Sequence, residues 1–105
     1  LPDPRFNEMQ RQTILRIRAG QLDEVLNEHL PRILHPSRLS DKTLTETIRK
    51  IQNRCAPETY CRQIQAMIDD YSTLDILSKI HCKTLVIHGR EDALFSLKDQ
   101  ETMAN

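Results

Sequence analysis

Glycine constrains this chain more than any other residue type, because it stands at only two of the 105 positions, Gly20 and Gly89. Glycine adopts positive φ angles without a steric cost, so a chain with two glycines has few places for the tight turns that connect strands. Folds rich in β-sheet are therefore disfavoured. The same scarcity excludes the phosphate loops G-x-G-x-x-G and G-x-x-x-x-G-K-[ST], and it excludes the G-x-S-x-G turn that carries a nucleophilic serine.

Helical periodicity dominates the chain as far as residue 78. Asp3 as N-cap and Pro4 as first helical residue predict the start of one helix, and Gly20 suits the position just beyond its end. A second helix is expected over residues 21–30, before Pro31. The remaining predicted starts are the N-cap Ser40, Pro57, and the capping box Ser72-Thr73-Leu74-Asp75.

Apolar stripes on these helices predict the core. Their members are Leu22, Val25 and Leu26 on the second helix, with Tyr60, Ile64, Met67 and Ile68 on the helix after Pro57. Cys55 and Cys61 fall near apolar helix faces, where we expect them to pack as small hydrophobic side chains rather than act as nucleophiles. An odd count of three cysteines, Cys82 being the third, indicates reduced thiols and a cytoplasmic protein.

The pattern changes after residue 80. Thr84-Leu85-Val86-Ile87-His88 is short, apolar and β-branched without alternation, which predicts a strand over residues 84–88 that is buried on both faces. A turn over residues 89–92 follows, and Ser96 and Asp99 predict a capping box for a helix from residue 97. A strand buried in this way needs neighbouring strands, and no other segment has a strand pattern. We therefore expect the chain to be a segment of a larger protein.

Residues 74–92 resemble the return from the cap into the core in the α/β-hydrolase superfamily. The matching residues are Leu77, Ile80, the strand Thr84-Leu85-Val86-Ile87 and the turn Gly89-Arg90-Glu91-Asp92. The resemblance implies a mainly α chain of four to five cap helices with one short β-strand, from a parent α/β-hydrolase fold with a helical cap. Residues 1–78 would form the cap (lid), and residues 79–105 would form a partial return into the core. In that family the Asp of G-x-x-D is the acid of a Ser–Asp–His triad, which makes Asp92 the expected catalytic residue.

The resemblance also implies a function. The parent is expected to hydrolyse a small carboxylic ester or lactone, without a cofactor or a metal, although related folds also host dehalogenase, epoxide and C–C hydrolase chemistry. The 105 residues alone are expected to be inactive, because no G-x-S-x-G is present and no histidine follows Asp92. The alternative is a standalone helical interaction module that self-associates through residues 84–88, in which Asp92 only caps a turn after Gly89.

Charge and composition exclude other partners. Lys and Arg total 15 and Asp and Glu total 15, so a net charge of zero favours neither nucleic acid nor an anionic membrane. The longest apolar runs, such as Leu85–Ile87, are far too short to cross a bilayer. The cysteines and the four histidines lack the spacing of zinc ligands, so we expect no metal site; the histidines are His29, His35, His81 and His88.

Overall fold

The computed structural model describes residues 4–69 and 74–105, and these residues are mainly helical. The chain forms two compact units, Leu1–Tyr71 and Ser72–Asn105. The sequence predicts a cap over residues 1–78, and the compact units divide between residues 71 and 72. None of the helices in the described ranges combines the length and the apolar composition that crossing a bilayer requires.

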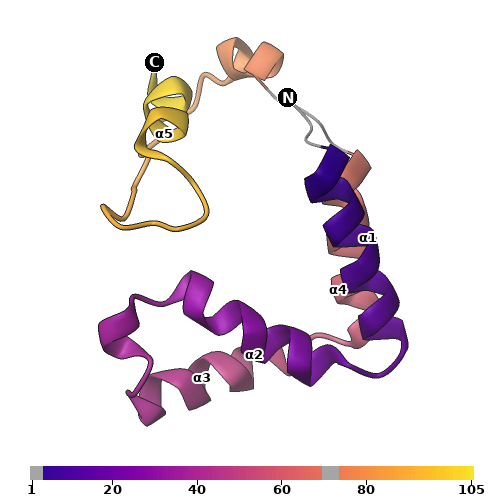
Figure 1. Ribbon diagram of the computed structural model, residues 1–105. Coiled ribbons are helices and arrows are strands. Elements are labelled where there is room, and N and C mark those ends of the chain that lie inside the picture. Colours follow the sequence, from indigo (N-terminus) through magenta and orange to yellow (C-terminus); the bar gives the residue numbers. More distant parts are fainter. Residues whose placement is uncertain (1–3, 70–73) are drawn as a thin grey trace. The chain divides into compact units, whose positions relative to one another are not determined.

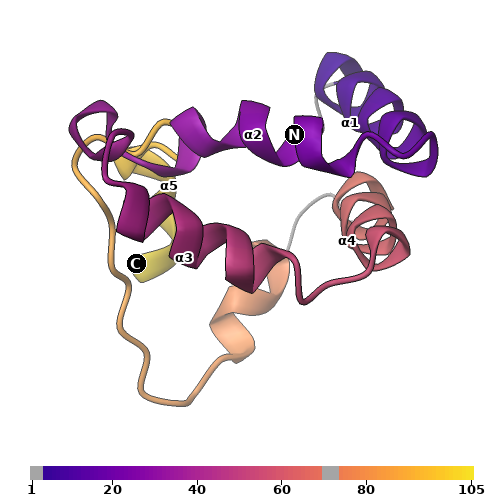
Figure 2. The same ribbon diagram turned by 90° about the horizontal axis from the view of Figure 1, so that it is seen from below.

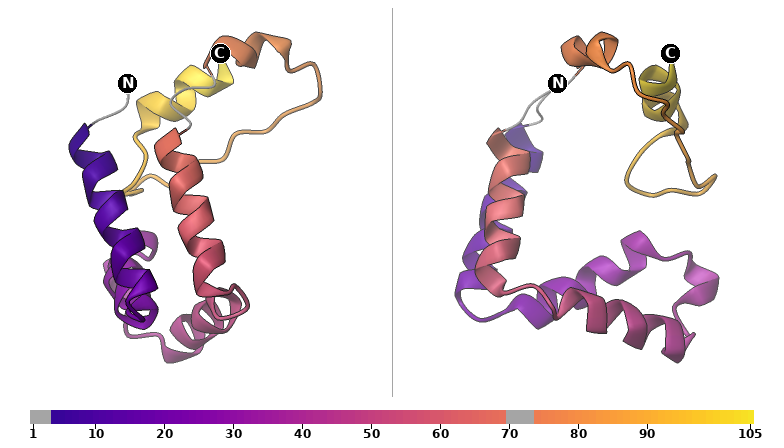
Figure 3. Two further views of the ribbon diagram at one scale, coloured as in Figure 1. Left: turned by 90° about the vertical axis from the view of Figure 1, so that its right-hand side faces the viewer. Right: turned by 180° about the vertical axis from the view of Figure 1, so that it is seen from behind.

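The described residues of the first unit form four α-helices. They are α1 (Pro4–Arg18), α2 (Leu22–Ile33), α3 (Lys42–Gln52) and α4 (Pro57–Asp69), with a short 3-10 helix, Pro36–Arg38, between α2 and α3 (Figure 1). Helices α1 and α4 lie side by side and run in opposite directions (Figure 3). Helices α2 and α3 form a hairpin around the 3-10 turn (Figure 2), and Arg49 of α3 pairs with Asp23 of α2 at 3.1 Å. The predicted starts at Pro4 and Pro57 are confirmed, while Asp3 lies outside the described residues.

The core of this unit lies where α1, α2 and α4 meet. Its buried members are Ile14, Ile17, Val25, Cys61 and Ile68, and Leu22, Tyr60 and Ile64 pack against them. Most members of the predicted stripes therefore form core contacts. Leu26 is buried but lies outside this cluster, and Met67 is 52% exposed. Cys61 packs as the predicted core hydrophobe: it is 1% exposed, and its Sγ–H donates to the Ile14 carbonyl oxygen at 3.9 Å.

Gly20 ends α1 in the predicted way. Its φ of +87° lies in the left-handed region, and nothing stands within 4 Å of where a Cβ would be. The Gly20 N–H donates to the Ile17 carbonyl and the Gln21 N–H donates to the Arg16 carbonyl, both at 3.0 Å. These two bonds form the Schellman motif that closes a helix at a glycine.

Two predicted helix boundaries are wrong. The N-cap of α3 is Asp41 rather than Ser40, because the Asp41 carboxylate accepts from the Leu44 N–H at 3.1 Å. Helix α2 does not stop before Pro31 but continues through it to Ile33. Pro31 has no N–H to donate to the carbonyl four residues earlier, and its ring crowds that carbonyl, and the helix ends two residues later at Ile33.

The second unit has less regular structure. A 3-10 helix spans Leu74–Lys79, and α5 spans Leu97–Ala104. The predicted capping box of α5 is present, since Ser96 Oγ accepts from the Asp99 N–H and Asp99 Oδ2 accepts from the Ser96 N–H. The earlier predicted box begins at Ser72 and Thr73, which lie outside the described residues.

The predicted strand over residues 84–88 is wrong. These residues have no regular secondary structure, and no strand occurs in the described ranges. Leu85 and Ile87, which were expected to be buried, are 81% and 82% exposed. A strand exists only where a second segment supplies the other half of the hydrogen-bond ladder, and the described chain offers none.

Candidate functional site

Asp92 lies in a short turn between residue 88 and the start of α5. The Asp92 N–H donates to the Gly89 carbonyl at 3.1 Å, which closes the turn. Its Oδ1 accepts from two backbone N–H groups, Leu94 at 2.8 Å and Phe95 at 3.1 Å. Within the ranges that the structure describes, its Oδ2 accepts no hydrogen bond. One oxygen therefore anchors the carboxylate, and the other is available to a donor.

The surroundings of Asp92 favour its ionised form. The backbone N–H of Leu94, followed by that of Phe95 and by a Coulombic contribution of His88, holds the pKa of the Asp92 carboxyl below its usual value. The side chain is exposed. Near neutral pH the turn thus presents a carboxylate, a group that accepts hydrogen bonds and donates none.

The side chain of His88 also binds this turn. Its Nε2 lies 3.1 Å from the Phe95 carbonyl oxygen. A carbonyl oxygen only accepts, so this bond requires the hydrogen to be on Nε2. His88 thereby fastens the turn to the end of the segment before it, and this bond to a backbone carbonyl was not predicted from the sequence. The signal was weak, because a histidine just before a Gly-x-x-Asp turn has no characteristic spacing to a backbone carbonyl.

In the described part of the chain, no three His, Cys, Asp or Glu side chains gather so that they could hold a metal ion. Cys61 is buried and Cys55 is half-buried, while Cys82 is exposed, and all three are free thiols. His35 is engaged locally, since its Nδ1 accepts from the Ser37 N–H at 3.2 Å.

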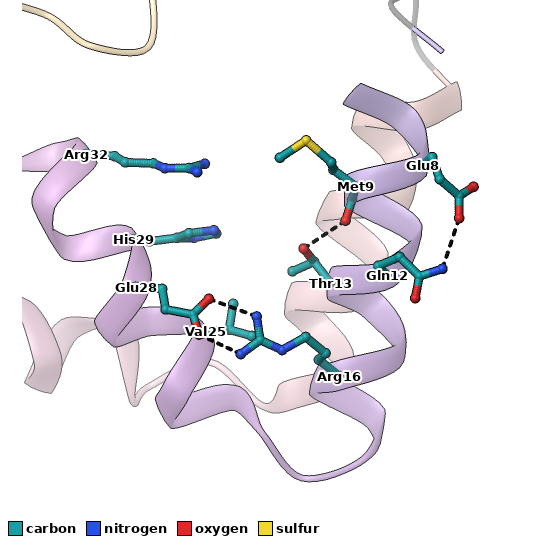
Figure 4. A pocket seen from close by; sticks show the side chains of 9 residues that line it. All are labelled: Glu8, Met9, Gln12, Thr13, Arg16, Val25, Glu28, His29 and Arg32. Carbon is teal, nitrogen blue, oxygen red and sulfur yellow. Dashed lines mark hydrogen bonds and ion pairs between the residues drawn. The ribbon is translucent and has the colours of Figure 1, made fainter. Parts of the chain in front are cut away.

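A cleft between α1 and α2 was missed by the sequence analysis (Figure 4). It has a volume of about 300 Å³ and lies entirely within the first unit. His29 and Arg32 stand three residues apart on α2 and extend toward the Met9 side of α1 (Figure 4). That spacing places two residues on one helix face, and it is the signal from which the cleft could have been suspected.

No protein-family description, curated protein or solved structure matches this chain. Its function is therefore inferred from its own residues.

Proposed function

We propose that residues 1–105 supply the helical cap and the acid-bearing turn of a serine α/β-hydrolase that acts on a small carboxylic ester or lactone. The observation that carries the proposal is the Asp92 carboxylate, whose Oδ1 is anchored by two backbone N–H groups while its Oδ2 stays open. The resemblance of the Gly89–Asp92 turn and the segment before it to this superfamily adds to that observation.

In this proposal Asp92 is a positioning residue for a histidine that lies outside the 105 residues. Oδ2 would accept the Nδ1–H of that histidine, which fixes the tautomer whose Nε2 takes the proton of the attacking serine. Because the carboxylate is already anchored and ionised, it also stabilises the imidazolium that forms as the serine attacks the acyl carbon. The acid itself is not protonated during the reaction.

His88 and Phe95 support this role. The bond from His88 Nε2 to the Phe95 carbonyl engages the residue whose N–H also donates to Asp92 Oδ1. The carboxylate is thus held at a fixed point of a turn that is itself tied down. Such fixed orientation is what a catalytic group requires, since small displacements of the histidine reduce the rate strongly.

A second candidate function is an interaction module that self-associates through residues 84–88. The exposure of Leu85 and Ile87 favours it. Backbone N–H and C=O groups of these residues make no hydrogen bonds among the described residues, so the segment is a template for strand pairing. In this function Asp92 would only close a turn.

Ester hydrolysis distinguishes the two functions. The assay uses the protein encoded by the whole reading frame that contains these residues, together with its Asp92→Asn variant. Hydrolysis that depends on Asp92 supports the hydrolase. A protein without esterase activity, or a variant as active as the wild type, opposes it and leaves the interaction module.

A further inference from the structure

The cleft between α1 and α2 combines one open cationic group with an apolar wall. Arg32 makes no hydrogen bond or ion pair in the described part of the chain, and it extends beside His29 toward α1 (Figure 4). Met9 lines the opposite side and is 57% exposed, so it supplies accessible apolar surface, whereas Val25 also lines the cleft but is 3% exposed and belongs to the core. A volume of about 300 Å³ is at the small end of ligand sites.

The other charged groups of the cleft are already engaged. Arg16 and Glu28 form two parallel bonds at 2.8 and 2.7 Å. Glu8 accepts from Gln12 at 2.9 Å and pairs with Arg11 at 3.7 Å. Both carboxylates therefore have hydrogen-bonded or paired cationic partners. The charge of Arg32 also acts on Glu28, but its N–H donors are left open to a ligand.

We propose that this cleft binds a short-chain carboxylate, with the carboxylate between Arg32 and His29 and the apolar tail against Met9. A guanidinium donates to both oxygens of a carboxylate, which makes arginine well suited to this group. The thioether of Met9 adapts to tails of different shape. The inference does not depend on the hydrolase function, because it involves only the first unit.

The pKa of His29 can be used to detect binding. Burial, and then the charge of Arg32, hold the pKa of His29 below its usual value, and Arg16 acts in the same direction while Glu28 opposes it. A bound anion beside the ring would favour the charged imidazolium. Binding is therefore expected to raise the pKa of His29.

The test is a titration of the full chain with sodium butyrate at constant ionic strength, followed by the NMR signals of the His29 ring and the Met9 methyl group. We expect saturable shifts of both signals and a rise in the His29 pKa. Arg32→Gln should weaken binding about tenfold, the usual loss for a hydrogen bond to a charged group. Arg62→Gln removes the same charge from an exposed site on α4 outside the cleft, and it should bind like the wild type.

Four results would overturn the inference. Shifts that do not saturate, or that are equal in the two arginine variants, would mean a general ionic effect. Equal binding of inorganic phosphate would remove the role of the apolar tail, and equal binding of 1-butanol would remove the role of the charge. The amide spectrum of each variant checks that the fold is retained.

Discussion

Ile17 shows how much of the first unit's stability rests on single side chains. It is 2% exposed in a core with few buried members. We expect Ile17→Ala to lower the free energy of unfolding by about 2–4 kcal/mol, because it removes buried methyl groups and leaves a cavity. Leu15→Ala is the matched control on the same helix, since Leu15 is 57% exposed.

Chemical denaturation of both variants measures this difference. The control should change the free energy of unfolding by less than about 0.5 kcal/mol, as surface substitutions usually do. Equal losses in the two variants would mean that α1 does not pack as described.

At the residue scale, the sequence identified the core better than the sites. The stripes that contain Val25 and Ile68 were predictable, because helical spacing alone decides which side chains share a face. The anchoring of Asp92 by Leu94 and Phe95 was not, because side-chain bonds to backbone N–H groups depend on the path of the turn. Met67 lies on the predicted stripe but is exposed, so helical spacing alone does not decide which side chains are buried.

At the element scale, the two glycines make a matched pair. Gly20 has a φ of +87°, whereas no such angle occurs at Gly89, and both have free space around the position of a Cβ. We expect Gly20→Ala to lower the free energy of unfolding by about 1–2 kcal/mol, because an L-residue in the left-handed region is strained. Gly89→Ala should cost less than about 0.5 kcal/mol. Thermal unfolding compares them, and an equal response would contradict the Schellman motif at the end of α1.

Helices were predictable at this scale and the strand was not. A helix closes its hydrogen bonds within its own segment, so spacing, Pro4 and the Ser96–Asp99 box are enough to locate its start. A strand depends on a partner segment, and the β-branched pattern of residues 84–88 says nothing about whether one is present. The choice between Ser40 and Asp41 as N-cap was also open, because both residue types cap helices well.

At the scale of the whole molecule, the second unit leaves its apolar side chains uncovered. None of its described residues is buried. The exposed apolar side chains include Leu74, Ile76, Ile80, Leu85, Ile87, Leu94, Phe95, Leu97 and Met103. A unit this small cannot reach independent stability without burying such groups, so we expect another chain or segment to cover them.

Self-association of the 105-residue chain tests this expectation. We expect concentration-dependent dimers or larger species in sedimentation velocity, formed through residues 84–88. Ile87→Lys should dissociate them, because it places a charge where an apolar side chain would be buried between copies. Ser78→Lys is the control, because Ser78 is an exposed polar residue outside this segment. A wild-type chain that stays monomeric at high concentration, or a control that dissociates equally, would contradict the expectation.

The proposed function is tested most directly by the kcat for ester hydrolysis. It is measured for the protein encoded by the whole reading frame and for its Asp92→Asn and Asp99→Asn variants. In Asp92→Asn the amide oxygen of the new side chain can still accept from Leu94 and Phe95, so the turn should persist, but an amide no longer stabilises the imidazolium as a carboxylate does. We predict a fall in kcat of about 10⁴-fold with little change in KM for Asp92→Asn. Asp99→Asn, a change in a helix cap, should stay close to wild type. A wild-type kcat in Asp92→Asn, or equal losses in both variants, would show that Asp92 is not the acid.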